Sequence, residues 1–219
     1  MQRPPNYQTH ARIAGVLFLA AIVAAIVGGG LIETYLGPEN QLANAVANKA
    51  MLGWAVGLEA LNALAVIAIG ALFFPVLRQF SEASAAGYLG MRISEAVLYF
   101  LGAMIPLALI NMGQSTPVPA LETAAPLLAL RPVLMELAVP IFLGLGGLVM
   151  YVSAFKSGIL PRFLTLWGMV AAAMMVVGNI WDWSTYMQIL LVMPLLLNEV
   201  VLGLWLIVRG FTIKPDVET

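Results

Sequence analysis

Five charged side chains interrupt the apolar stretches of this 219-residue sequence, and they are the residues best suited to chemistry. They are Glu59, Arg92, Glu95, Glu136 and Glu199. A charged group at the centre of a membrane helix costs at least about 2.5–3.5 kcal/mol on insertion scales. Arg92 and Glu95 are three residues apart, as are Glu59 and Asn62, so each pair projects from one side of its helix.

The helical rise predicts that the charged groups lie at different depths in a bilayer. Measured from the cytoplasmic boundary, Arg92 is expected about 6 Å in, Glu95 about 10 Å and Glu199 about 15 Å. Glu59 is expected at about 18 Å and Glu136 at about 22 Å. These groups would form a ladder across the membrane, with Glu199 near its middle.

Two interpretations of this cluster remain open. In the first, Arg92 pairs with Glu95 and also with Glu199, the other glutamates accept hydrogen bonds from backbone freed by prolines, and the cluster fixes helix register. In the second, the excess of carboxylates leaves some without a cation. Burial favours the neutral form of such a group, so Glu59 or Glu199 would bind a proton or a small cationic solute. The candidate binding residues are Glu199, Glu59, Glu95, Arg92, Asn62 and Glu136.

The composition indicates a membrane protein and excludes several classes of function. Apolar residues make up 62% of the chain and charged residues 10%, with a mean hydropathy of +0.96, whereas soluble domains are about half apolar and one quarter charged. The net charge of −1 argues against a nucleic-acid partner. Cysteine is absent and His10 is the single histidine, which excludes disulfides, thiolate sites and Ser-His-Asp chemistry. We therefore expect no cofactor, no metal site and no enzymatic activity.

Six apolar stretches are long enough to cross a hydrocarbon core of about 30 Å, which needs about 20 residues. They predict an all-α, six-helix membrane bundle forming one domain over residues 1–219. The first stretch is kept as an uncleaved helix, because its apolar run is too long for a signal peptide and no A-x-A site closes it. The predicted spans are about 13–34, 52–77, 88–112, 131–155, 162–182 and 188–210.

The basic residues predict the orientation of these spans. With six spans, seven Lys and Arg residues fall on the side of both termini and two on the opposite side, so both termini are expected in the cytoplasm. The seven are Arg3, Arg12, Arg78, Lys156, Arg162, Arg209 and Lys214, and the two are Lys49 and Arg131.

The outer loops and the small residues complete the predicted architecture. Residues 35–51 are expected to form a short surface helix, which Pro38 can start, and residues 113–130 a second short segment that lies along the membrane. These loops are expected to cap the outer face of the bundle, and this interpretation is favoured over a functional role.

Small residues four apart, such as Gly28 on the first helix and Gly53 with Gly57 on the second, predict close helix contacts.

Several stretches resemble a family of small bacterial multi-pass membrane proteins, domain-of-unknown-function family 4386. They are ARIAGVLFLAAIVA, ALFFPVLRQFSEASAAGYLGMRISEAVLYFLG, GILPRFLTLWGMV and NEVVLGLWLIVRGF. The Arg-x-x-Glu element of the family matches Arg92 and Glu95, and its late Glu before a Leu-Trp-Leu-Ile run matches Glu199. The resemblance covers roughly residues 11–211. It implies a six-helix protein of the bacterial inner membrane and supplies no activity.

Two functional hypotheses follow from the sequence. The first is a small transporter, or a ligand-binding membrane protein, whose carboxylate and arginine cluster binds a proton or a small cation. The second is a structural or regulatory protein that packs against a membrane-protein partner, or against its own copies, through a small-residue face. An intramembrane enzyme is disfavoured, because paired aspartates and histidine ligands are lacking.

Overall fold

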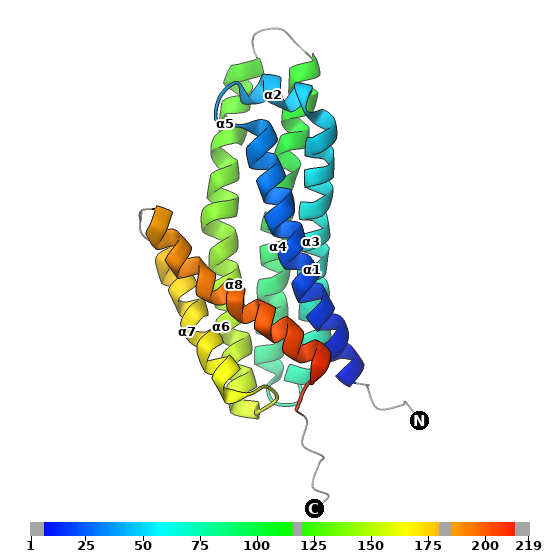
Figure 1. The fold of residues 1–219 in the computed structure, drawn as a ribbon, viewed down its shortest axis with the longest axis vertical. Helices are drawn as coiled ribbons and strands as arrows, with labels where there is room; N and C mark the ends of the chain where they lie inside the picture. The colour runs from blue at the N-terminus through cyan, green and yellow to red at the C-terminus, as the bar shows by residue number, and fades with distance from the viewer. Residues whose placement is uncertain (1–6, 116–119, 180–184, 213–219) are drawn as a thin grey trace, which may run out of the picture.

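The computed structural model describes residues 7–115, 120–179 and 185–212, and every regular element within those ranges is helical. Both the first residue of the first helix and the last residue of the last helix lie at the same end of the bundle (Figure 1). The elements are α1 (Tyr7–Leu36), α2 (Gln41–Ala47), α3 (Lys49–Leu77), α4 (Glu82–Ser115), α5 (Ala120–Pro132), the π-helix η1 (Val133–Ala138), α6 (Val139–Ser157), α7 (Arg162–Gly178) and α8 (Thr185–Val208).

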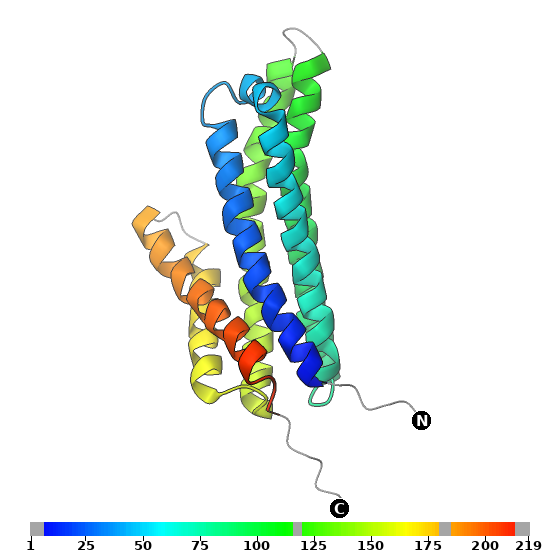
Figure 2. The same ribbon diagram turned by 45° about the vertical axis from the view of Figure 1, so that its right-hand side comes forward.

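The long helices pack in a ring. In order around it, α1 contacts α3, α3 contacts α4, α4 contacts α6, α6 contacts α7, α7 contacts α8, and α8 returns to α1. The ring closes only at the end where α8 finishes, because α7 and α8 diverge from the rest of the bundle toward the other end (Figures 1 and 2). The end of the bundle opposite the two termini, here called the outer end, is built from α1, α3, α4 and α5, with α2 lying across it (Figure 1).

Within the described residues, five helices are long and apolar enough to cross a membrane: residues 7–36, 49–77, 82–114, 124–157 and 189–208. The predicted sixth span, residues 162–182, corresponds to α7, an apolar helix of 17 residues. That length falls short of a span, so a sixth crossing is not confirmed, and residues 180–184 lie outside the described part of the chain. The prediction of an all-helical membrane bundle is confirmed.

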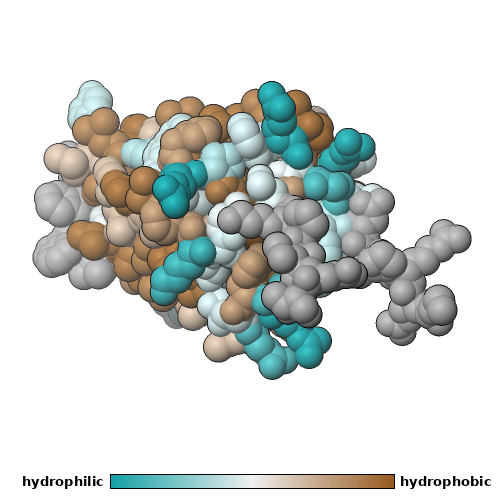
Figure 3. All heavy atoms as spheres, turned by 90° about the horizontal axis from the view of Figure 1, so that it is seen from below, coloured by the Kyte–Doolittle hydropathy of each residue, from teal (hydrophilic) through white to brown (hydrophobic). Residues whose placement is uncertain are grey.

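The basic residues that the sequence assigns to one side do gather at one end of the bundle. Figure 3 views that end, and hydrophilic side chains project from it. Arg3 and Lys214 lie outside the described residues. The described members at this end are Arg12, Arg78, Lys156, Arg162 and Arg209.

The short helix predicted in residues 35–51 is confirmed as α2. Gly37, with φ of 64°, ends α1 in the left-handed conformation that favours glycine, and its N–H donates to Glu33 O. Asn44 then donates to Leu36 O at 2.9 Å and Asn48 to Tyr35 O at 3.1 Å. These side chains satisfy carbonyls at the end of α1 and fix α2 across the outer end of the bundle.

The prediction of a separate short segment within residues 113–130 is wrong. The described part of it, α5, runs on through η1 into α6 as one long rod (Figure 1). Pro132 and Pro140 each remove a donor from the helical ladder. The backbone between them takes the wider π pattern, as in the bond from Val139 N–H to Leu134 O.

Glycines mark where helices approach most closely. A Cβ on Gly15 of α1 would lie 2.5 Å from Gly203 O of α8, and a Cβ on Gly203 would lie 3.1 Å from Gly15 O, so these residues form the crossing point of the two helices. A Cβ on Gly28 would lie 3.1 Å from Ala55 O of α3, which confirms an intramolecular contact at this position. The predicted contact at Gly57 is not found, because a Cβ there would meet nothing within 4 Å.

Candidate functional site

Arg92 is the centre of a buried polar cluster that joins α4 to α8. Its side chain is 2% exposed. Gly70 of α3 makes room for it, since a Cβ there would lie 3.1 Å from Arg92 Cβ. The guanidinium donates from Nη1 to Glu95 Oε2 at 2.9 Å and from Nη2 to Glu199 Oε1 at 3.3 Å. The predicted pairing of Arg92 with both glutamates is confirmed.

Two aromatic residues hold the guanidinium on its other sides. Arg92 Nε donates to Tyr88 Oη at 3.1 Å, and Arg92 Cζ lies 5.4 Å from the centre of the Tyr88 ring. The Phe18 ring of α1 lies 5.7 Å from the same atom. Aromatic faces attract a cation electrostatically, most strongly when the pair is shielded from water. Arg92 is therefore fixed from α1, α4 and α8 at once.

A pocket of about 140 Å³ lies against this cluster. Its polar lining comes from α3, α4 and α8, the three helices from which the sequence predicts a cluster. Asn62 is 5% exposed and makes no hydrogen bond with any described residue. Its amide therefore faces the pocket with donors and an acceptor that no described residue uses. The polar residues that line the pocket are Asn62, Arg92, Glu95, Tyr99 and Glu199.

Glu59 lies outside this pocket and is paired elsewhere. Its carboxylate is fully buried and accepts a hydrogen bond at 2.9 Å from Arg131 Nη2 of α5. The expectation that Glu59 lacks a cation is therefore wrong. The sequence assigned Arg131 to the outer boundary and did not consider it as a partner. Glu59 Oε2 and Arg131 Nε remain buried without a hydrogen-bond partner among the described residues.

Glu136 does not join either group. It lies in η1 and is exposed on the surface of the bundle. Glu136 lies 21 residues, or about 31 Å, from Ser157 at the end of α6. Glu59 lies 18 residues, or about 27 Å, from Leu77 at the end of α3. Both distances along the helix exceed the predicted depths of about 18 Å for Glu59 and about 22 Å for Glu136, so those two depths were too small.

The inner groups lie at one level and do not form the steps of a ladder. Arg92 is ten residues, or about 15 Å, from the start of α4 at Glu82. Glu199 is nine residues, or about 14 Å, from the end of α8 at Val208. The predicted ladder is thus replaced by one mid-depth cluster and one ion pair nearer the outer end.

Four residues of these two sites were not identified from the sequence. Tyr88 precedes Arg92 by four residues, a spacing that places both on one helix face and could have identified it. Tyr99 follows Glu95 by four residues, so the same spacing could have identified it. Phe18 and Arg131 approach from other helices, so no local signal in the sequence points to them.

The family model described as "Domain of unknown function (DUF4386)" matches residues 13–210. No curated protein and no solved structure gives a significant match. The matched range contains both glutamates that contact Arg92, and it runs from within α1 to just beyond the end of α8. The chain therefore belongs to the DUF4386 family, a domain family of unknown function.

Proposed function

We propose that this protein binds a proton or a small cation at the Arg92 cluster, as a small membrane transporter or a ligand-binding membrane protein. The observation that carries the proposal is that two carboxylates, Glu95 and Glu199, share one guanidinium beside a pocket. The proposal assigns no catalytic residue.

The charge balance of the cluster requires a further positive charge. With both carboxylates ionised, Glu95 and Glu199 outnumber Arg92 by one negative charge. An unbalanced charge in a low-dielectric interior is costly and is neutralised by a proton or by a bound cation. These two occupants compete for the same carboxylates, so the site can exchange one for the other.

The pocket supplies suitable ligands for the cation. Carboxylate and amide oxygens are hard donors, and hard cations prefer oxygen. The Asn62 amide lines the pocket and makes no hydrogen bond with a described residue, so within the described part of the chain it can turn its oxygen toward a cation without breaking an existing bond. Ammonium-type cations would instead donate hydrogen bonds to the same oxygens.

The test is proton release from purified protein in a weakly buffered detergent solution, followed with a pH indicator. Addition of sodium or methylammonium chloride should release protons from the wild type. Glu199→Gln and Glu95→Gln should abolish the release, because each variant leaves Arg92 balanced by one carboxylate. Glu33→Gln, at an exposed position of α1, is the matched control and should behave as wild type. Equal release from wild type and both site variants contradicts the proposal.

We further propose that the protein lies in a bacterial inner membrane with both termini in the cytoplasm. The collection of Arg and Lys at one end of the bundle supports this orientation under the positive-inside rule. A cysteine introduced at Arg12 should resist a membrane-impermeant maleimide in intact cells, whereas one at Lys49 should react. The reverse pattern would contradict the orientation.

The alternative role as a structural or regulatory partner keeps one supporting observation. Gly53 and Gly57 are spaced for close helix contact, yet open space surrounds both. If this face packs on a partner or on a second copy, replacing both glycines with leucine should abolish co-purification or cross-linking. Gly90→Leu, at an equally open position of α4, should leave it unchanged.

A further inference from the structure

Building on the proposed cation site, we infer that its ligand is a hydrophobic amine dissolved in the bilayer. The amine carries one positive charge and reaches Glu95 and Glu199 sideways, between α1 and α8. This inference rests on the proposed function and names the class of molecule that the same site takes.

The route follows from how α1 and α8 cross. The two backbones touch at Gly15 and Gly203. Beyond that point the helices diverge, and α8 leaves the bundle toward its own start (Figures 1 and 2). Ile22 and Leu196 each lie seven residues, or about 10 Å, beyond the crossing, and both line the pocket. The pocket therefore opens in the angle between the two helices.

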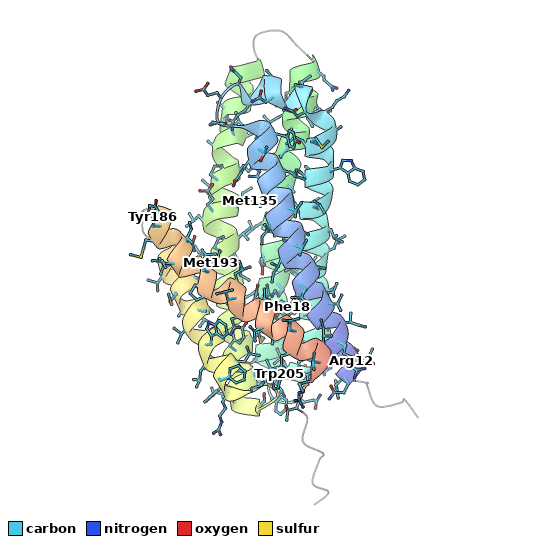
Figure 4. All side chains as sticks on the ribbon, in the orientation of Figure 1. Arg12, Phe18, Met135, Tyr186, Met193 and Trp205 are labelled. Carbon is cyan, nitrogen blue, oxygen red and sulfur yellow. The ribbon has the colours of Figure 1, made fainter. Side chains whose placement is uncertain are left out.

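This opening is at membrane depth and not at the water boundary. Counted along α1 from Arg12, the rim residues from Ala21 to Ile26 lie about 14–21 Å in, which is the middle of a hydrocarbon core of about 30 Å. Figure 4 places Phe18, the ring beside Arg92, near the crossing of α1 and α8. A molecule that passes through this opening comes from lipid.

The lining changes in character from the rim to the floor. The rim is aliphatic, and Ile26 is 59% exposed on the outer side of α1. The floor carries the Arg92 cluster and Asn62, together with buried apolar side chains such as Val66 and Ile69. An apolar rim over a floor with one excess negative charge matches an amphiphile whose head is a single ammonium group. The apolar residues of the rim are Ala21, Ile22, Ala25, Ile26, Leu143 and Leu196.

The size of the pocket agrees with a head group and not with a whole ligand. Sites that enclose a drug-sized molecule measure about 300–1,000 Å³, whereas this pocket measures about 140 Å³. The pocket can hold the ammonium and its first carbons, and the tail remains in the opening among lipid chains. The carboxylates accept the N–H bonds, and the guanidinium of Arg92 repels any second positive charge.

The test uses the full chain in phosphatidylcholine nanodiscs with a dodecylamine that carries a photoreactive diazirine in its chain. The wild type should be labelled near Ile22 and Leu196, and unlabelled dodecylamine should compete. The matching dodecanol probe should label at least about tenfold less, because it lacks the charge. Ala25→Phe should fill the opening and reduce amine labelling at least about tenfold. Val23→Phe, on the lipid-facing side of α1, is the matched control and should not.

The outcomes separate this inference from the proposed function. Equal labelling by amine and alcohol, or labelling unchanged by Ala25→Phe, overturns the lateral amine site. The cation site itself then stands if methylammonium still releases protons in a manner that depends on Glu199. If Glu199→Gln changes neither amine labelling nor proton release, both the amine site and the cation site are wrong.

Discussion

The described part of the protein holds two buried arginine–carboxylate groups, and they differ in their charge balance. The outer pair is one to one, since Arg131 meets Glu59 and no second described carboxylate. The inner cluster is one to two, since Arg92 meets Glu95 and Glu199. A balanced pair can serve as a register device between α3 and α5 without any ligand. The unbalanced cluster needs a further positive charge, and it is the one beside a pocket.

The surroundings of the two arginines also differ. The Arg92 side chain is 2% exposed and lies between the Phe18 and Tyr88 rings, whereas the Arg131 side chain is 16% exposed at the edge of α5. An exposed edge allows water to solvate a charge whose partner is lost. The comparison therefore predicts different costs for the same kind of mutation in the two places.

The largest loss of stability is expected for Arg92→Met. This change leaves two buried carboxylates with no cation, and removing one partner of a buried ion pair costs about 3–5 kcal/mol. Thermal unfolding in detergent should show a much lower midpoint than for wild type. A midpoint equal to that of wild type would mean that water or lipid head groups already reach the cluster.

Arg131→Met should destabilise less, by about 1–3 kcal/mol, the usual cost of leaving a buried polar group unsatisfied. Only one carboxylate, Glu59, is stranded, and the Arg131 side chain that it loses is 16% exposed. The same unfolding assay, run in parallel with Arg92→Met, tests the ranking. If Arg131→Met lowers the unfolding midpoint more than Arg92→Met does, the outer pair contributes more to the stability of the bundle than the inner cluster does.

Gly28→Leu should cost about 1–3 kcal/mol through overpacking. A Cβ at this position would lie 3.1 Å from Ala55 O and 3.2 Å from Glu59 Cγ, so the larger side chain pushes α1 away from the outer pair. Gly29→Leu is the matched control, because a Cβ there would meet nothing within 4 Å. Equal unfolding midpoints for both variants would contradict the contact between α1 and α3.

The smallest effect on stability is expected for Glu199→Gln, within about 1 kcal/mol of wild type, since a neutral hydrogen bond replaces part of the lost one. The variant converts the inner cluster into a one-to-one pair like the outer one. Chemical unfolding monitored by circular dichroism measures the difference. A loss as large as that of Arg92→Met would show that the second carboxylate is needed for the fold, and the binding proposal would lose its main argument.

Much of the fold could be predicted because membrane helices are specified by long-range composition. Apolar runs defined five spans, and Pro38 located the start of the segment that contains α2. The length of α7 was overestimated, because apolar residues continue past Gly178 where the described helix ends. The union of α5 with α6 was missed, because the prolines of residues 113–130 suggested a separate segment, whereas Pro126 lies inside the helix α5.

The candidate site was predicted only where its members are close in sequence. The Arg92–Glu95 contact follows from a spacing of three on one helix, and its extension to Glu199 followed from charge alone. The pairing of Glu59 with Arg131 spans 72 residues and depends on how α3 and α5 pack. Helix periodicity carries no information about such a contact, so only the folded arrangement reveals it.

The shortness of α7 has a consequence for the membrane around the protein. Its 17 residues measure about 26 Å, against about 30 Å for a typical hydrocarbon core. Lipids beside a helix that is too short are compressed or displaced, at a cost of fractions of a kcal/mol per Å. If α7 crosses the membrane, the bilayer should therefore be thinner beside α7 than beside α3 and α4. Such an uneven annulus would orient the molecule in the membrane and favour its sorting into thinner bilayers.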